Sequence, residues 1–261
     1  VIDSRKTPKS GLFIAIKGEN NDGHEFIKQA AENGCKLAII SQKVETNIST
    51  ILVKDTFIAL YKLAEFSRQR SQAKIIAITG SVGKTGTKEM LKKAFETQGK
   101  TFATVGNLNN HFGVPLSLCN FARDCDFGIF EMGMNHLNEI KPLSKLTRPH
   151  LAIVTNVGPA HIEFFKNEEE IALAKSEIFL GLETNGFALI NADNRHFDFL
   201  KNRLHALKIP KEISFGQRNN ANYQIIEESL INASKSVVTV KLKNDKNISY
   251  EISSSNPAVI F

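Results

Sequence analysis

The sequence predicts an α/β fold in which helices cover a mainly parallel sheet, with a smaller antiparallel part added near the end. Two observations support this prediction. Apolar strand-like runs alternate with amphipathic helical patterns along most of the chain, and a glycine-rich loop joins one such strand to the following helix. The composition agrees, because 42% hydrophobic and 23% charged residues are typical of globular proteins. A chain of 261 residues can form one large domain or two ordinary ones, and we expect two.

Residues 1–71 are predicted to form a small α/β domain. Strands are expected at residues 12–16, 37–40 and 51–53, and helices at 24–33 and 55–70. The second helix has Asp55 or Thr56 as its cap, and its expected apolar face comprises Ile58, Leu60, Leu63, Ala64 and Phe66. A polar stretch at residues 67–72 follows this helix and marks the domain boundary.

Residues 72–261 are predicted to form the second domain. Its parallel strands are expected at residues 74–79, 127–130, 151–155 and 187–190, with a helix at 86–98 after the first of them. In such a sheet, ligands bind beyond the carboxyl ends of the strands. Shorter runs at 223–226, 236–242 and 248–252 are predicted to form the antiparallel part.

The composition also excludes several classes of protein. No apolar run approaches the roughly 18 residues that a membrane span needs, so we expect no membrane insertion. Three cysteines without a C-x-x-C pair indicate reduced thiols in a cytosol rather than disulfides or a zinc site. The 33 basic and 27 acidic residues give a net charge of +6, but the basic residues are scattered. This distribution argues against nucleic acid as a partner and suits anionic small molecules.

The strongest local signal is the segment TGSVGKT at residues 79–85, which lies between a predicted strand and a predicted helix. A phosphate chain needs close backbone N–H groups, a helix N-terminus, a lysine and a hydroxyl that can hold Mg²⁺. The segment departs from the general phosphate-loop pattern, because Ile78 stands where the first glycine is usual. The alternative is a glycine turn with an exposed lysine. We predict a phosphate-binding loop, with these residues in contact with the ligand: Gly80, Ser81, Gly83, Lys84 and Thr85.

Further polar residues lie near predicted strand ends. Glu131 follows the strand at 127–130, and His161 comes soon after the strand at 151–155. Both side chains could therefore reach Mg²⁺ and phosphate at the same edge of the sheet. Taken singly, each signal is weak, because a lone histidine or glutamate at such a position is more often a surface or capping group.

Five segments together resemble, in order, the motifs of the ATP-dependent Mur ligase family of peptidoglycan synthesis: TGSVGKT, GNLNNHFGVPLSL, EMGMNH, TNVGPAHIE and AKSEIF. The segments DSRK, GLF, GEN and DGH near the start are similar to the uridine-nucleotide-binding domain of some family members. The resemblance runs from about residue 2 to about residue 200. The EMG signature is similar to that of the members that add D-alanyl-D-alanine.

The resemblance implies a bacterial cytoplasmic, monomeric ligase that uses ATP and Mg²⁺. It would join D-alanyl-D-alanine to UDP-N-acetylmuramoyl-tripeptide through an acyl phosphate. By likeness to the family motifs, Lys84 would stabilise the transferring phosphoryl group and Thr85 would hold the first Mg²⁺. Glu131 and His161 would be ligands or near neighbours of Mg²⁺.

The resemblance also implies roles for residues that show no pattern of their own. Lys175 would be a carbamate that helps hold a second Mg²⁺, although from the residues alone it would be a solvated lysine. The remaining expected contacts are to phosphates or the acyl substrate from Asn107, Asn109 and Asn110, to adenine from Asn191 and Asp193, and to the uridine diphosphate from Ser4 and Arg5.

Two departures from the family qualify this interpretation. The sequence does not begin with Met, and residues 254–261 do not resemble the family's continuation, so the C-terminal ligase domain is expected to be absent. We therefore expect this chain alone to bind nucleotide weakly and not to complete ligation. Two alternatives stay open: a related ligase that adds the third amino acid or is of the polyglutamate type, and a non-catalytic nucleotide-binding fragment. EMGMNH and GNLNN argue against the related ligase.

Overall fold

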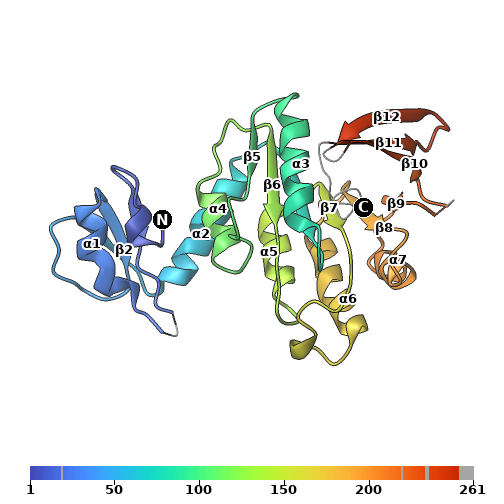
Figure 1. Cartoon of the computed structure of the whole chain (residues 1–261). Coiled ribbons are helices and arrows are strands. Elements are labelled where there is room, and N and C mark those ends of the chain that lie inside the picture. Colours follow the sequence, from blue (N-terminus) through green and yellow to red (C-terminus); the bar gives the residue numbers. More distant parts are fainter. Residues whose placement is uncertain (19, 219, 233–234, 253–261) are drawn as a thin grey trace. The chain divides into compact units, whose positions relative to one another are not determined.

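The structure is a computed structural model that describes residues 1–18, 20–218, 220–232 and 235–252 (Figure 1). Glu19 of the GEN segment and the residues 254–261 discussed above therefore lie outside the described residues. The chain divides into two compact units, and the division falls between Arg70 and Ser71. One short segment departs from the sequence prediction, because residues 115–120 belong to the first unit.

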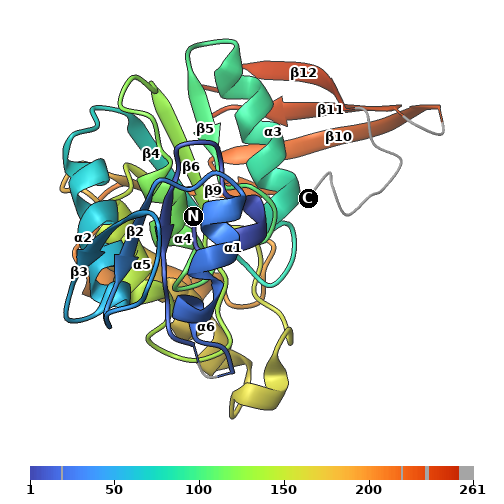
Figure 2. The ribbon, with the colours of Figure 1, turned by 90° about the vertical axis from the view of Figure 1, so that its left-hand side faces the viewer.

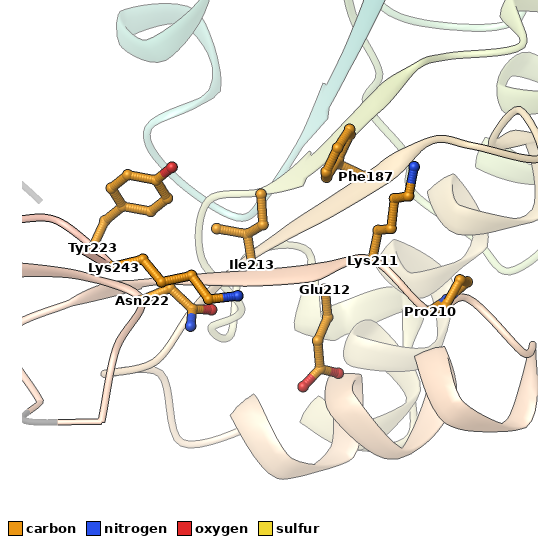
Figure 3. A pocket seen from close by; sticks show the side chains of 8 residues that line it. All are labelled: Phe187, Pro210, Lys211, Glu212, Ile213, Asn222, Tyr223 and Lys243. Atoms are coloured by element: carbon orange, nitrogen blue, oxygen red, sulfur yellow. The ribbon is translucent and has the colours of Figure 1, made fainter.

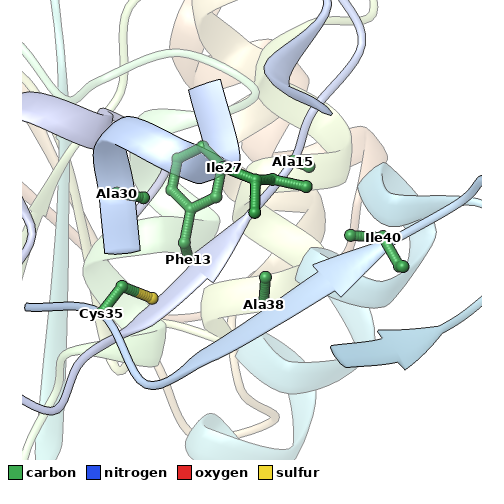
Figure 4. Packing of buried hydrophobic residues seen from close by; sticks show 7 residues of the cluster. All are labelled: Phe13, Ala15, Ile27, Ala30, Cys35, Ala38 and Ile40. Atoms are coloured by element: carbon green, nitrogen blue, oxygen red, sulfur yellow. The ribbon is translucent and has the colours of Figure 1, made fainter. Parts of the chain in front are cut away.

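The first unit contains a sheet of three parallel strands in the order β1-β2-β3: β1 (Leu12–Ile14), β2 (Leu37–Ile40) and β3 (Ser49–Leu52). Its helices are α1 (Ile27–Glu32) and α2 (Thr56–Gln69). Buried residues from β1, β2, α1 and the residues next to them in the chain pack into one cluster (Figure 4): Phe13, Ala15, Ile27, Ala30, Cys35, Ala38 and Ile40. Short apolar strands and one amphipathic helix thus suffice to bury this small core.

Several details of the first unit differ from the sequence prediction. β1 ends at Ile14 rather than at residue 16, and β3 starts two residues earlier and ends one residue earlier than expected. The helix expected from residue 24 starts as a 3₁₀ turn (Gly23–Phe26) before α1. Asp55 caps α2 by accepting a hydrogen bond from the Ile58 N–H at 2.9 Å, but the Ile58 and Phe66 side chains are 53% and 63% exposed. Leu60, by contrast, is fully buried. At 100° per residue, Ile58 and Phe66 point about 160° and about 120° away from Leu60 around the helix, so the predicted apolar face was too wide.

The second unit is built on a nine-stranded sheet with the order β12-β11-β10-β9-β8-β7-β4-β6-β5. Its strands are β4 (Lys74–Thr79), β5 (Thr101–Ala103), β6 (Phe127–Glu131), β7 (Leu151–Val154), β8 (Phe187–Asn191), β9 (Glu212–Gly216), β10 (Tyr223–Asn232), β11 (Lys235–Lys241) and β12 (Asn247–Ile252). The helices after these first strands are α3 (Lys84–Glu96), α4 (Gly113–Cys119), α5 (Ile140–Thr147), α6 (Glu168–Ser176) and α7 (Phe197–Ala206), and α4 ends within the segment assigned to the first unit.

The expected division of the sheet into parallel and antiparallel parts is confirmed. Strands β4 to β9 pair in parallel, and β10, β11 and β12 form an antiparallel extension that is visible in red at one side of Figure 2. The extension joins the rest of the sheet through a short parallel pairing of β10 with β9. The sequence analysis missed β5 and β9, and α3 begins at Lys84 rather than at residue 86.

The carboxyl ends of the central strands meet at one edge of the sheet. Ile78 of β4 pairs with Glu131 of β6, and Thr79 of β4 pairs with Val154 of β7. Segments that are 50 to 75 residues apart in the sequence are thereby brought together, as the order of parallel strands requires. None of the helices in the described part of the chain is long and apolar enough to cross a membrane.

Candidate functional site

The loop between β4 and α3 has the shape that a phosphate needs. Gly83 is the cap of α3 and has a φ of 83°, which is a conformation that favours glycine. A Cβ at Gly80 would collide with the Thr155 hydroxyl, so the loop also requires glycine for space. The N-terminus of α3 therefore opens onto a loop of closely packed backbone, which is the arrangement that binds anions.

Ser81 braces this loop against the segment that follows β7. Its hydroxyl donates to the Gly158 carbonyl at 2.9 Å, and the Gly158 N–H donates back to Ser81 Oγ at 3.0 Å. Thr155 adds a second brace, because its hydroxyl donates to the Val82 carbonyl at 2.6 Å. Ser81 thus holds the loop in shape through its side chain, and the sequence analysis did not assign a role to Thr155.

Lys84 begins α3 and folds back over the loop. Its Nζ donates to the Gly80 carbonyl at 2.7 Å. Burial lowers the pKa of Lys84, while the negative charge of Glu131 acts in the opposite direction. The ammonium group is therefore held next to the helix N-terminus, where a phosphate oxygen would replace a carbonyl as its partner.

Glu131 lies at the end of β6, where it is buried and only 2% exposed. The Thr85 hydroxyl donates to Oε2 at 3.0 Å, and the Asn109 amide donates to Oε1 at 2.9 Å. The structure thus brings together three of the predicted site residues, which come from α3, from the loop after β5 and from β6. A hydroxyl beside a buried carboxylate is a suitable pair of oxygen ligands for Mg²⁺.

The hydroxyl of Thr85 and the carboxylate of Glu131 are oxygen donors, which are the ligands that Mg²⁺ takes. Mg²⁺ usually keeps several waters and binds through one or two carboxylates together with substrate phosphates. Thr85 and Glu131 fit that pattern, because they leave the other positions to phosphate and water.

Lys175 lies near the end of α6 and is 3% exposed, so it is not the solvated lysine that its sequence context alone would suggest. Burial, together with the smaller effect of the positive charge of Lys84, lowers the pKa of its ammonium group to about 7. A substantial fraction of the Lys175 amine is therefore neutral near pH 7. A neutral amine is the form that can react with carbon dioxide to give a carbamate.

Three other predicted residues have different surroundings. His161 is exposed, with a φ of 63°, at the start of a 3₁₀ turn (Ile162–Phe164). Asn107 is also exposed. Asn110 uses its side-chain oxygen to accept hydrogen bonds from the N–H groups of Phe112 and Gly113 at 3.1 and 2.9 Å. Asn110 therefore caps the start of α4, a local role that the sequence analysis did not distinguish from ligand contact.

Asn191 and Asp193 organise the loops beyond β8. The Asn191 amide donates to the Thr155 carbonyl at 3.2 Å. Asp193 accepts hydrogen bonds from the backbone N–H groups of Gln217 and Arg218 at 2.6 and 3.0 Å. These contacts fix the edge of the site on the β8 side, next to the loop that Thr155 braces.

In the first unit, Ser4 and Arg5 form a short 3₁₀ turn with Lys6. Ser4 is buried and its hydroxyl donates to Gln29 Oε1 at 2.5 Å. The Arg5 guanidinium is exposed and forms two hydrogen bonds with the Asp3 carboxylate, at 2.9 and 3.0 Å. Ser4 is therefore used to anchor the turn, whereas Arg5 presents its charge to solvent.

Two residues of the DGH segment, Asp22 and His24, form a hydrogen-bonded cluster with Ser41 in the same unit. His24 Nδ1 lies 2.5 Å from Asp22 Oδ1, and His24 Nε2 accepts a hydrogen bond from the Ser41 N–H at 2.9 Å. Because Nε2 is an acceptor, Nδ1 is the protonated nitrogen that donates to Asp22. Both ring nitrogens are occupied, so this cluster fixes the chain after β1 to the end of β2. The spacing of Asp22 and His24 was visible, but Ser41 gave no signal.

A pocket of about 310 Å³ lies elsewhere in the second unit (Figure 3). Lys211 Nζ lies over the Phe187 ring, 5.0 Å from its centroid, and both side chains line this pocket together with Glu212. Phe187 begins β8 and Glu212 begins β9, so the pocket is at the amino ends of the strands. Because these strands are parallel to β4, the pocket is at the edge opposite the phosphate loop.

The parallel sheet, the glycine-rich loop before α3 and the buried Glu131 define a protein of the P-loop nucleotide-binding class. Sequence comparison identifies the family. The family model "Mur ligase middle domain" matches residues 78–257, and the model "Mur ligase family, catalytic domain" matches residues 1–81. The chain belongs to the Mur ligase family.

Curated relatives and solved structures agree with this assignment. A UDP-N-acetylmuramoyl-tripeptide--D-alanyl-D-alanine ligase of Rickettsia prowazekii is 43% identical over 226 residues, covering 86% of this chain and 50% of the relative. A MurF crystal structure from Acinetobacter baumannii has a TM-score of 0.87 and 32% identity, covering 100% of this chain and 56% of that one. MurF of Thermotoga maritima in complex with ADP has a TM-score of 0.84 and 27% identity, covering 100% and 59%. The chain spans about half the length of the curated relatives it matches.

Proposed function

We propose that this chain contains the nucleotide site and the UDP-substrate site of an ATP-dependent ligase of peptidoglycan precursor synthesis. The ligase joins D-alanyl-D-alanine to UDP-N-acetylmuramoyl-tripeptide. One observation supports this most directly: Lys84, Thr85 and Glu131 converge at the carboxyl ends of β4 and β6. The names of the relatives supply the acceptor and the substrate.

The proposed reaction has two steps. An oxygen of the tripeptide carboxylate attacks the γ-phosphorus of ATP, the bond to the β,γ-bridging oxygen breaks and ADP leaves. The amine of D-alanyl-D-alanine then attacks the acyl carbon, the peptide bond forms, and inorganic phosphate leaves with the amine losing a proton. Lys84 and the loop N–H groups stabilise the charge on the phosphoryl oxygens during the first step.

Thr85 and Glu131 would hold Mg²⁺, since they already form a hydrogen-bonded pair of oxygen ligands. By likeness to the family motif, His161 would lie near that ion. When bound, Mg²⁺ offsets the charge of the phosphate oxygens. The neutral amine of Lys175 would add to the carbon of carbon dioxide and lose a proton, and the resulting carbamate would supply a negative group for a second Mg²⁺. The burial of Lys175 beside Lys84 supports this role, because a neutral amine at physiological pH is what carbamate formation needs.

In the first unit, Arg5 binds the diphosphate of the UDP substrate. Its exposed guanidinium is a suitable partner for an anion, and Asp3 holds it in place until the ligand binds. We further propose that the protein acts as a monomer in the bacterial cytoplasm, where ATP and UDP-linked precursors are available, without a nucleic-acid partner.

The test is a ligation assay with the protein expressed from the whole gene that encodes this sequence. With ATP, Mg²⁺ and UDP-N-acetylmuramoyl-tripeptide, phosphate release should require D-alanyl-D-alanine, and the UDP-linked product should gain the mass of that dipeptide. A control replaces the dipeptide with single amino acids, including glutamate and diaminopimelate. Phosphate release with one of these acceptors and none with D-alanyl-D-alanine would show that the acceptor has been assigned wrongly.

A further inference from the structure

We propose that Asn109 and Gly133 form a clamp that positions the Glu131 carboxylate for Mg²⁺–nucleotide, so that Asn109 acts as a positioning residue and not as a phosphate contact. The proposal rests on the proposed nucleotide site. It assigns a shared task to two motifs that are more than 20 residues apart, GNLNN and EMG.

The first observation is that the Glu131 oxygens have separate donors. Thr85 donates to Oε2, and the Asn109 amide donates to Oε1 at 2.9 Å. A buried carboxylate requires such donors, because an unpaired charge away from water is costly. The amide N–H of Asn109 can only donate here, which fixes the orientation of its side chain. Its oxygen then points away from Glu131.

The second observation is that the backbone of Asn109 is tied to the residue after Met132. The Gly133 N–H donates to the Asn109 carbonyl at 2.8 Å, and the Asn109 N–H donates to the Asn107 carbonyl at 2.8 Å. Asn109 is therefore attached to the end of β6 at two points, through its carbonyl and through its side chain. An attachment of this kind restricts the amide to one position relative to Glu131.

The third observation explains the glycine. Gly133 is not among the residues with a positive φ, so its backbone conformation does not require glycine. A Cβ at this position would instead lie 3.1 Å from Asn109 Oδ1, 3.2 Å from Cγ and 3.3 Å from Nδ2. Contacts this close would push the amide away. Glycine at position 133 therefore lets the Asn109 amide keep its place, whereas a methyl group there would displace that amide by a few tenths of an ångström.

These three observations make a specific prediction about coupling. Removing the amide and adding a methyl group at residue 133 should cause the same loss, because both displace the donor from Glu131. Once the amide is gone, the methyl group has room, so the second change should add little. Residues that act through one contact are non-additive in this way.

The experiment measures the binding of a non-hydrolysable ATP analogue by calorimetry, with Mg²⁺ and with EDTA, for Asn109→Ala, Gly133→Ala and the double variant. Each single variant should lose about tenfold in affinity with Mg²⁺, since partners that orient metal ligands typically contribute that much. Affinity in EDTA should be unchanged. The double variant should lose no more than either single variant. An equal loss in EDTA would mean that Asn109 contacts phosphate, which would overturn the proposal.

A second readout does not depend on nucleotide. The unfolding midpoint in urea should fall for Gly133→Ala and should be partly restored when Asn109→Ala is added. Gly86→Ala is the matched control, because a Cβ there would meet nothing within 4 Å. Asn202→Ala, at an exposed position of α7, controls for loss of an amide.

Additive losses in the unfolding midpoint would overturn the clamp whatever the binding data show. If the unmodified chain bound no nucleotide, the proposed function would fail on its own, and the unfolding series would still decide whether the clamp exists.

Discussion

Two ionisable side chains of the candidate site, Glu131 and Lys175, are buried. Glu131 and Lys175 are almost inaccessible to solvent, and the charge of Lys84 influences the pKa of Lys175. The sequence offered Lys84 and Glu131 as candidate site residues, because the motifs that contain them are local. It did not predict their burial or their partners, since those depend on strands that are distant in the sequence. The Asn109–Glu131 hydrogen bond is an example.

Lys175 should make stability depend on pH. Its pKa is about 7 in the folded chain and 10.5 in the unfolded chain, so between these values the unfolded state binds more protons and stability rises with pH. Below pH 7 the buried Lys175 amine is protonated, so burial of its charge lowers the free energy of unfolding by the full amount. Lys175→Met should therefore raise the free energy of unfolding at pH 6 by a few kcal/mol, since a tenfold change in proton affinity corresponds to about 1.4 kcal/mol. The gain should shrink as the pH approaches 10.

Urea unfolding between pH 6 and 9.5 in buffer free of carbon dioxide measures this effect. Lys93→Met, at an exposed position of α3, serves as the control and should show no such trend. If Lys175→Met raised the free energy of unfolding by the same amount at every pH, the pKa of Lys175 would not be lowered in the folded chain.

At the element scale, the parallel strands were predicted well because each is an apolar run bounded by turn residues. β4 has the predicted bounds, and β6, β7 and β8 differ from prediction by one residue each at the carboxyl end. β5 was missed because only three residues pair, too few for a periodic pattern. The start of α5 could not be predicted either, because its cap comes from a residue nearly 40 positions away.

That cap is Glu177, which accepts hydrogen bonds from the Asn138 and Lys141 N–H groups at 2.6 and 3.0 Å. Glu177→Ala should lower the free energy of unfolding by about 1 to 3 kcal/mol, because it removes two partly buried hydrogen bonds that contribute about 0.5 to 1.5 kcal/mol each. Glu177→Gln keeps one acceptor oxygen and should lose about half as much. Urea unfolding measures both, with Glu228→Ala at an exposed position of β10 as the control. Equal stability of the Ala variant and the unmodified chain would contradict this account of α5.

At the scale of the whole molecule, each unit has its own core, and the chain crosses between the units more often than the sequence indicated. Residues 115–120 return to the first unit, where Cys119 packs against the cluster of Ile14, Ile39 and Leu60. Apolar periodicity cannot reveal such a return, because a short helix looks the same in either unit. The domain division proposed from the sequence therefore needs this segment added to the first unit.

A fragment of residues 1–70 should consequently be less stable than the complete first unit, which also contains residues 115–120. Without residues 115–120, part of the Leu60 cluster is exposed to water. Joining residues 113–121 to the fragment through a flexible linker should raise its urea midpoint and reduce its binding of a hydrophobic dye. The same linker ending in a scrambled segment is the control. If the bare fragment were as stable as the fusion, residues 115–120 would not be part of the first unit's core.

A calorimetric titration of this chain would show whether the loop before α3 is a working nucleotide site. The ligand is a non-hydrolysable ATP analogue with Mg²⁺, and the comparison is between the unmodified chain, Lys84→Ala and the control Lys93→Ala. We predict saturable binding that Lys84→Ala abolishes and Lys93→Ala leaves intact, with all three chains folded by circular dichroism. Equal affinity of the unmodified chain and Lys84→Ala would contradict the account, because the ammonium group beside Gly80 would then have no role in holding phosphate.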